Sequence, residues 1–124
     1  MPILLGVAIA GAVGAAARYQ LDGFISSRVS GLFPWGTFAI NISGAFVLGL
    51  LFTIFTERLN VQPWVRSSVT IGFLGAYTTF STLTLETAQL IQQGAYATAL
   101  LNSLGGLAVG MVAVFAGIFI GRLV

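Results

Sequence analysis

Residues 72 to 84 of this chain read GFLGAYTTFSTLT, and this stretch decides the fold. Six of its thirteen residues carry a hydroxyl group, yet it lies within an apolar run long enough to enter a bilayer. Lipid offers no hydrogen-bond partners, so these groups must face protein, water or a ligand. Gly72, Gly75 and the run Tyr77-Thr78-Thr79 also make a poor continuous helix. The stretch predicts a broken, hydroxyl-lined helix at membrane depth, where something small binds or passes.

The composition predicts an all-α integral membrane protein. Hydrophobic residues make up 57% of the chain and charged residues only 6%, with a mean hydropathy of +1.01. A soluble domain carries about 25% charged residues. A membrane-spanning helix needs roughly 20 residues, so 124 residues accommodate four spans with short connections. We therefore expect a single four-helix transmembrane domain over residues 1–124.

The residue types exclude several kinds of chemistry. The chain has no Cys and no His, which removes disulfides and the commonest zinc sites. Three acids and no Lys leave almost no material for general acid–base catalysis, so we do not expect an enzyme. The pI near 9.7 rests on five arginines, too few for a nucleic-acid surface.

Hydropathy and the positions of turn-forming residues such as Gly and Pro divide the chain into four expected spans. The first lacks the basic start of a signal peptide, and Arg18-Tyr19 follows its apolar run where a cleavage site would be expected. The last two are joined by a tight turn at Gln93-Gly94. The spans are expected at Ile3–Asp22, Trp35–Phe55, Val65–Gln92 and Tyr96–Val124, the third being broken.

The arginines give almost no preferred orientation. With four spans, Arg58, Arg66 and Arg122 lie on one side, and Arg18 and Arg28 on the other. Orientation follows the Lys/Arg imbalance between the two sides, which is three to two. Either this weak bias still orients the chain, or both orientations occur, and then an antiparallel, dual-topology homodimer becomes natural.

Amide side chains in the second and fourth spans are candidates for a polar path. Thr37 and Asn41 are four residues apart, hence on one helix face. Asn41 either lines this path or joins two helices by a hydrogen bond. Asn102 has two amide donors to place, whereas the neighbouring Ser103 can bond its own helix.

Three further residues stand out in the first and third spans. Phe80 lies among the hydroxyls, where it either packs or offers its positive ring edge to an anion. Glu86 is the only carboxylate well inside a span, a functional candidate unless it reaches interfacial water. Arg18 either gathers anions at a vestibule or anchors a helix end beside Asp22, one turn on.

Three motifs in register, one in each of the first three spans, resemble the CrcB/Fluc family of fluoride channels, and the likeness as a whole covers all four spans in order. They read Gly11-x-x-Gly14-Ala15-x-x-Arg18-Tyr19, then Pro34-x-Gly36-Thr37-x-x-x-Asn41-x-x-Gly44, then Gly72-x-x-Gly75-x-x-Thr78-Thr79-Phe80-Ser81-Thr82.

The resemblance implies an antiparallel, dual-topology homodimer in a bacterial inner membrane, with two fluoride-permeable pores. It also implies a structural sodium ion (Na+) at the dimer centre, held by backbone carbonyls of Gly75 and Thr78 from both copies. The implied anion path comprises Thr37, Asn41, Phe80, Ser81, Thr82, Glu86, Arg18 and Asn102. Fluoride is small and tightly hydrated, so such a path must replace lost water with donors.

The chain departs from the family pattern at two places. A second Phe commonly follows the first by three residues, and here that position is Leu83, which has no positive ring edge. Gly106 and Gly110 stand where relatives often carry serine.

The function expected is passive, selective fluoride export. The alternatives are a proton-coupled exporter of small cations, disfavoured because the first span has no acid before Asp22, and a non-transporting assembly subunit.

Overall fold

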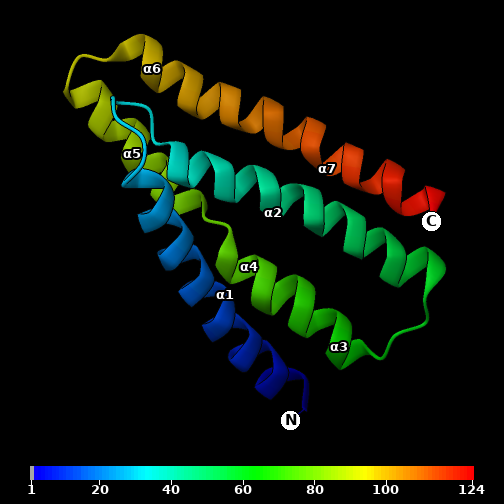
Figure 1. Ribbon diagram of the computed structural model, residues 1–124. Coiled ribbons are helices and arrows are strands. Elements are labelled where there is room, and N and C mark those ends of the chain that lie inside the picture. The colour runs from blue at the N-terminus through cyan, green and yellow to red at the C-terminus, as the bar shows by residue number, and fades with distance from the viewer. Residues whose placement is uncertain (1) are drawn as a thin grey trace.

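The computed structural model describes residues 2–124, and over this range the chain forms helices and connections without a strand. Figure 1 shows four helical passes joined by short connections. The α-helices are α1 (Pro2–Ser26), α2 (Trp35–Thr53), α3 (Pro63–Ser67), α4 (Gly75–Tyr77), α5 (Phe80–Gln92), α6 (Tyr96–Leu100) and α7 (Gly106–Leu123). Three π-helical segments continue or join them, namely η1 (Ile54–Arg58), η2 (Ser68–Leu74) and η3 (Leu101–Gly105).

Three of the four passes are long and apolar enough to cross a bilayer. They are Pro2–Ser26, Trp35–Arg58 and Tyr96–Leu123. The third pass consists of two pieces, Pro63–Tyr77 and Phe80–Gln92, each shorter than the roughly 20 residues that a single span needs. The prediction of an all-helical, multi-pass membrane protein is confirmed, with helix ends within a few residues of those expected.

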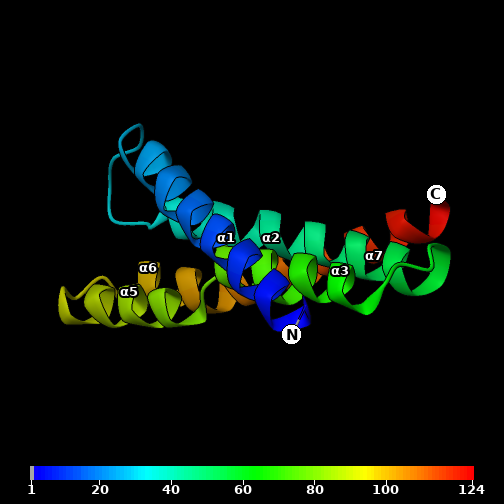
Figure 2. The same ribbon diagram turned by 90° about the horizontal axis from the view of Figure 1, so that it is seen from below.

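Glycines let the second and fourth passes touch along their length. α2 and α7 run side by side in Figures 1 and 2 and pack closely against each other. A Cβ at Gly49 would meet the backbone carbonyl of Val114, and one at Gly117 would meet that of Phe46. Small residues at such contacts allow close backbone packing, which drives helix association where lipid removes the hydrophobic force.

The first pass packs in the same way against the lower half of the third. α1 contacts η2 and α4, and Figure 2 shows it crossing them at an angle. A Cβ at Gly14 would meet the backbone of Phe73, and one at Gly72 would lie 2.8 Å from the carbonyl oxygen of Val7. Both glycines are therefore required by the closeness of these two backbones.

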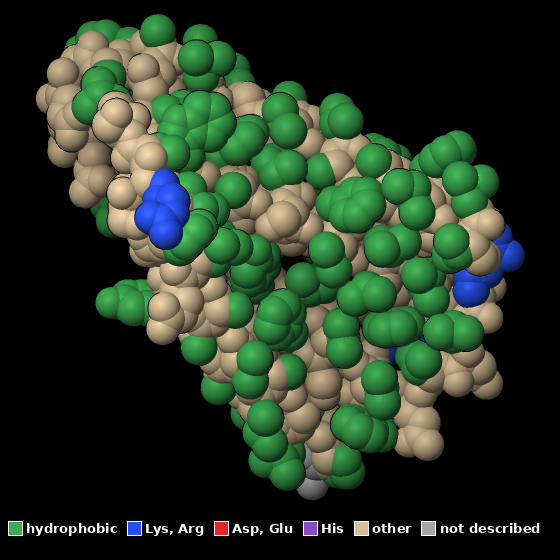
Figure 3. All heavy atoms as spheres, viewed as in Figure 1, with side chains coloured by type: hydrophobic (Ala, Val, Ile, Leu, Met, Phe, Trp, Pro, Cys, Tyr) green, Lys and Arg blue, Asp and Glu red, His purple; other side chains and the backbone are tan. Residues whose placement is uncertain are grey.

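The surface is that of a lipid-facing protein. In Figure 3 hydrophobic side chains cover most of the face, and the arginines seen there lie toward its two ends. At one end Arg122 Nε lies 3.2 Å from Glu57 Oε1, an exposed ion pair that joins α7 to η1. Exposed apolar side chains between charged ends are the pattern expected of helices that cross a bilayer.

Candidate functional site

The third pass stops being helical at two residues, Thr78 and Thr79. Their dihedral angles are φ −85°, ψ 160° and φ −152°, ψ 121°, both extended. The helix resumes at Phe80 because Thr79 acts as its N-cap: Thr79 Oγ1 accepts a hydrogen bond from the N–H of Thr82 at 3.2 Å. We call Thr78 and Thr79 the break.

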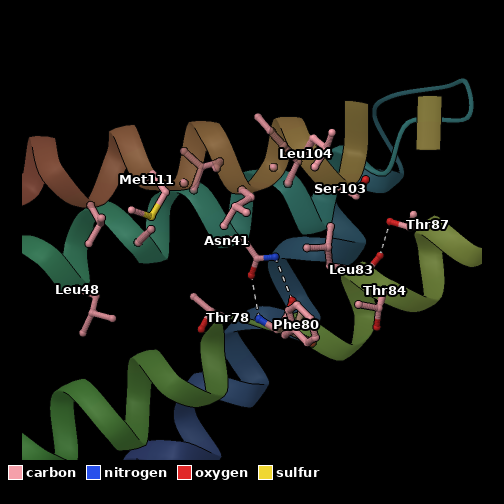
Figure 4. Close-up of a pocket in the computed structure, with 18 of the residues that line it drawn as sticks. Asn41, Leu48, Thr78, Phe80, Leu83, Thr84, Thr87, Ser103, Leu104 and Met111 are labelled. Atoms are coloured by element: carbon pink, nitrogen blue, oxygen red, sulfur yellow. Dashed lines mark hydrogen bonds between the residues drawn. The ribbon is translucent and has the colours of Figure 1, made fainter. Parts of the chain in front are cut away.

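Asn41 of α2 holds the break through both ends of its amide. Its Nδ2 donates to the carbonyl oxygen of Thr79 at 3.0 Å, and its Oδ1 accepts from the N–H of Thr79 at 2.8 Å. The two dashed lines that start at Asn41 in Figure 4 mark these bonds. The amide thus pairs with the extended backbone as a neighbouring strand would, and one Nδ2 hydrogen is left for another acceptor.

The next turn of α2 supports the same segment. Ser43 Oγ and the Tyr77 hydroxyl lie 3.0 Å apart in a hydrogen bond. A Cβ at Gly44 would collide with Thr78 Cγ2 and would lie 3.2 Å from the Tyr77 ring. Asn41, Ser43 and Gly44 therefore form one docking surface for the break on α2.

The four backbone carbonyls of residues 75–78 have lost their usual helical donors. In a continuous helix the carbonyl of Gly75 would accept from the N–H of Thr79, but this N–H donates to Asn41 Oδ1 instead. The carbonyl of Thr78 would accept from the N–H of Thr82, but this N–H donates to the N-cap, Thr79 Oγ1. The carbonyl of Ala76 accepts from Arg18 Nε at 3.3 Å. Helix ends leave such carbonyls available to side chains, water or ligands. Gly75 and Thr78 therefore offer oxygen atoms to a cation.

A groove of about 820 Å³ opens beside the break. Figure 4 shows Thr78, Phe80 and Leu83 gathered around the Asn41 side chain, with α7 closing the far side. Phe80 is 77% exposed. The walls are mainly apolar, with a few polar side chains that converge on them: Asn41, Thr78, Thr79, Thr84, Thr87 and Ser103.

Thr37 and Glu86 meet away from this groove. Thr37 is 2% exposed and its hydroxyl donates to Glu86 Oε2 at 3.0 Å. The other carboxylate oxygen, Oε1, is buried and has no hydrogen-bond partner among residues 2–124. The pair joins α2 to α5 about one helical turn from the Asn41 contact, and it leaves one acceptor without a donor.

Asn102 is fully buried at the junction of α5 with η3. Its Nδ2 donates to Thr87 Oγ1 at 3.0 Å, and Thr87 Oγ1 in turn donates to the carbonyl of Leu83. Asn102 itself is not among the residues that line the groove, whereas Thr87 and Ser103 are. The amide oxygen of Asn102 has no partner within the described part of the chain. Ser103 Oγ bonds the carbonyl of Ala99 in its own helix, as expected.

The remaining sequence candidates lie around the start of α5 and on α1. The N–H of Thr82 donates to the N-cap Thr79, and the carbonyl of the exposed Ser81 accepts from the Thr84 hydroxyl. A helical pair of Arg18 with Asp22 was one of two alternatives for Arg18, and over residues 2–124 no ion pair joins them: Asp22 Oδ1 accepts from Ser26, and Arg18 donates to the carbonyl of Ala76.

Two residues that hold the site were given no role from the sequence. Thr87, which joins the groove to Asn102, was not singled out at all, and Gly44, whose lack of a side chain lets the break pack against α2, was named only within a family motif. Thr87 is one threonine among many in a polar stretch, so nothing in the sequence distinguished it. The spacing of three between Asn41 and Gly44 was the available signal for the second, because such residues share a helix face.

The chain matches the family model described as CrcB-like protein, Camphor Resistance (CrcB), over residues 5–118. The chain belongs to the CrcB family. Among curated members of that family, the fluoride-specific ion channel FluC of Magnetococcus marinus is 45% identical over 95% of this chain and 96% of its own length. The FluC proteins of Acidobacterium capsulatum, at 43% over 95% of this chain and 94% of its own, and of Hahella chejuensis, at 42% over 100% and 98%, are similar. These CrcB relatives are named as ion channels, in agreement with the prediction that the chain is not an enzyme.

Proposed function

We propose that this CrcB chain is a passive, fluoride-selective channel of a bacterial inner membrane, which lets fluoride leave the cell and lowers its toxic cytoplasmic concentration. The observation that carries the proposal is the similarity to relatives named fluoride-specific ion channels, which extends over 95% of the chain at 45% identity and includes the break and α2. The groove beside the break supports it, because it combines apolar walls with a few convergent donors.

The donors available at the groove suit a small anion. Asn41 keeps one amide hydrogen after pairing with Thr79, and Thr82 and Ser81 stand at the first turn of α5. The first N–H groups of a helix have no intrahelical acceptor and carry partial positive charge. The N–H of Thr82 is taken by the Thr79 N-cap, so Ser81 supplies the free N–H and both residues supply hydroxyls. Because fluoride is strongly hydrated, close donors of this kind must replace its water. Phe80, exposed in the groove, adds a positive ring edge.

We assign the anion path along this line of residues. Asn41 and Phe80 are its centre, with Ser81 and Thr82 beside them. Thr37 and Glu86 form a second polar point on the same two helices, and Asn102 supports the wall through Thr87. Arg18 lies at the opposite face of the break.

The carbonyls of Gly75 and Thr78 fit a structural sodium ion. Both have lost their helical donors, Gly75 is exposed, and Thr78 is extended. Carbonyl oxygens suit hard cations, and residues 2–124 contain no group of three or more acidic side chains that would compete for the ion. Two such carbonyls from each copy of the chain would hold the ion, which would neutralise the unwound backbone and attract anions to the site.

We further propose that a second, inverted copy covers the groove. Three arginines oppose two across the membrane, so the inserted chain has little preferred orientation. The chain has no cysteine, so a Ser27→Cys variant in the turn after α1 carries a single thiol. Labelling of comparable extent by an impermeant thiol reagent from both sides of the membrane is expected. Labelling from one side alone would refute dual topology.

The function is tested with purified protein in liposomes loaded with potassium fluoride. Potassium is released by an ionophore, and a fluoride electrode records efflux. The proposal predicts efflux without ATP or a proton gradient, at a rate independent of pH near neutrality and far above that of chloride. A proton-coupled exporter would need the gradient, and equal chloride and fluoride rates would refute selectivity.

A further inference from the structure

The Arg18 side chain has a use other than collecting anions. Its Nε lies 3.3 Å from the carbonyl oxygen of Ala76, in a half-buried position between α1 and α4. Among residues 2–124 the only ion pair is Arg122 with Glu57, so Arg18 is not committed to a carboxylate. The guanidinium is thus directed at backbone.

The packing of α1 brings Arg18 to this carbonyl. Gly14 lies one helical turn before Arg18, and therefore on the same face of α1. A Cβ at Gly14 would collide with the carbonyl oxygen of Phe73, so the two backbones touch there. This contact sets the separation of α1 from η2 and α4 and leaves the next turn of α1 opposite Ala76.

Ala76 lies in the last turn of a helix, where a positive charge stabilises the carbonyl end most. The lower half of the third pass is helical from Pro63 to Tyr77, and its carbonyl end carries partial negative charge. The usual donor for Ala76 would be the N–H of Phe80, which begins a separate helix. Arg18 supplies the missing donor and a positive charge together.

We propose that Arg18 is a positioning residue that caps the carbonyl end of α4 and thereby fixes the break. Of the four carbonyls freed there, Arg18 takes that of Ala76, which leaves those of Gly75, Tyr77 and Thr78; the first and last of these are the proposed cation ligands. The link from this cap to ion flow rests on the proposed channel function, whereas the cap itself does not.

The test compares Arg18→Gln, Arg18→Lys and a matched control, Arg28→Gln. Arg28 lies in the turn after α1, stacks on Phe24 at 4.2 Å and does not contact α4, so its replacement removes the same charge without the cap. Amide hydrogen exchange at Thr78 and Thr79 is measured in detergent, and fluoride efflux is measured over a range of fluoride concentrations and ionic strengths.

Arg18→Gln is expected to speed exchange at Thr78 and Thr79 about tenfold, which corresponds to roughly 1.4 kcal/mol. Arg18→Lys should restore part of the protection, and Arg28→Gln should match the wild type. Fluoride efflux by Arg18→Gln should fall by a similar factor at all fluoride concentrations, including saturating ones.

Unchanged exchange with efflux lowered only at low fluoride and low salt would overturn the cap and assign Arg18 to anion collection. Equal effects of Arg18→Gln and Arg28→Gln would overturn it as well. If wild-type protein passes no fluoride, the channel proposal fails, while the exchange data still decide the cap. If Arg18→Gln does not fold, amide exchange at Thr78 and Thr79 in Arg18→Lys decides. Amides protected at least in part, as expected above, support a cap by the positive charge. Amides that exchange as fast as those of a locally unfolded segment refute it.

Discussion

Replacing Asn41 by Leu removes both hydrogen bonds that hold Thr79, at nearly constant side-chain volume. The bonds are 3.0 Å and 2.8 Å long and join α2 to the only non-helical residues of the third pass. Interhelical hydrogen bonds in membrane proteins average about 0.6 kcal/mol with a maximum near 1.7, so two bonds give roughly 1.2 to 3.4 kcal/mol. Thr79 is only half-buried, so water can take part of the lost bonding, and we expect a loss of about 1–2 kcal/mol.

The loss is measured as the change in the free energy of unfolding in detergent, at a fixed protein concentration. Amide exchange at Thr79 is followed in parallel and should accelerate about tenfold or more, since 1.4 kcal/mol is a factor of ten. The matched control is Ser43→Ala, which removes one side-chain bond to Tyr77 from the same surface of α2. It should cost about 0.6 kcal/mol and leave the Thr79 amide protected. A stability change in Asn41→Leu no larger than in Ser43→Ala, with unchanged exchange at Thr79, would refute the reasoning.

Two further substitutions test the packing and the second polar contact. Gly14→Ala places a methyl group against the Phe73 backbone and should cost about 1–3 kcal/mol by overpacking, whereas Gly23→Ala, with no atom within 4 Å, should be neutral or slightly stabilising in the same unfolding assay. Thr37→Val removes the donor to Glu86 Oε2 and should cost about 1–3 kcal/mol, because the half-buried carboxyl group of Glu86 loses its only hydrogen bond among residues 2–124. A Thr37→Val protein as stable as the wild type would show that water replaces this donor.

Hydropathy predicted the helical passes because each of them is an apolar run of bilayer length. The sequence also predicted the end of α5, at the turn Gln93-Gly94. Gly94 has φ +80° there, a conformation that favours glycine. The helix ends differ by a few residues: α1 continues to Ser26 instead of Asp22, and the π-helical segment η1 extends the second pass to Arg58 instead of Phe55.

The structural role of the glycines before the break could not be predicted from the sequence. Gly72 and Gly75 suggested weak helix, but both are helical. Gly72 is needed because the backbone of α1 lies against it, with Val7 Cα 3.0 Å from where its Cβ would be. A contact between residues so far apart in the chain depends on how α1 crosses η2, which a single sequence does not encode in any local pattern.

The partners of the polar residues were only partly predictable. Helical spacing placed Thr37 and Asn41 on one face, yet they bond Glu86 and the Thr79 backbone respectively, because the third pass changes direction beneath them. The spacing of Arg18 and Asp22 suggested a local pair, and a more distant acceptor, the Ala76 carbonyl, prevails. Local periodicity predicts which residues share a helix face, whereas the packing of the passes decides which groups form contacts.

The most direct test of the account is fluoride efflux from liposomes containing wild type, Asn41→Leu or Ser43→Ala protein at matched density. Asn41 both fixes the break and offers a donor beside it, and a hydrogen bond to a charged group contributes about 1.5–3 kcal/mol. The account predicts rapid, fluoride-selective efflux for the wild type and Ser43→Ala, and at least about a tenfold slower rate for Asn41→Leu. Equal rates for Asn41→Leu and the wild type would contradict it.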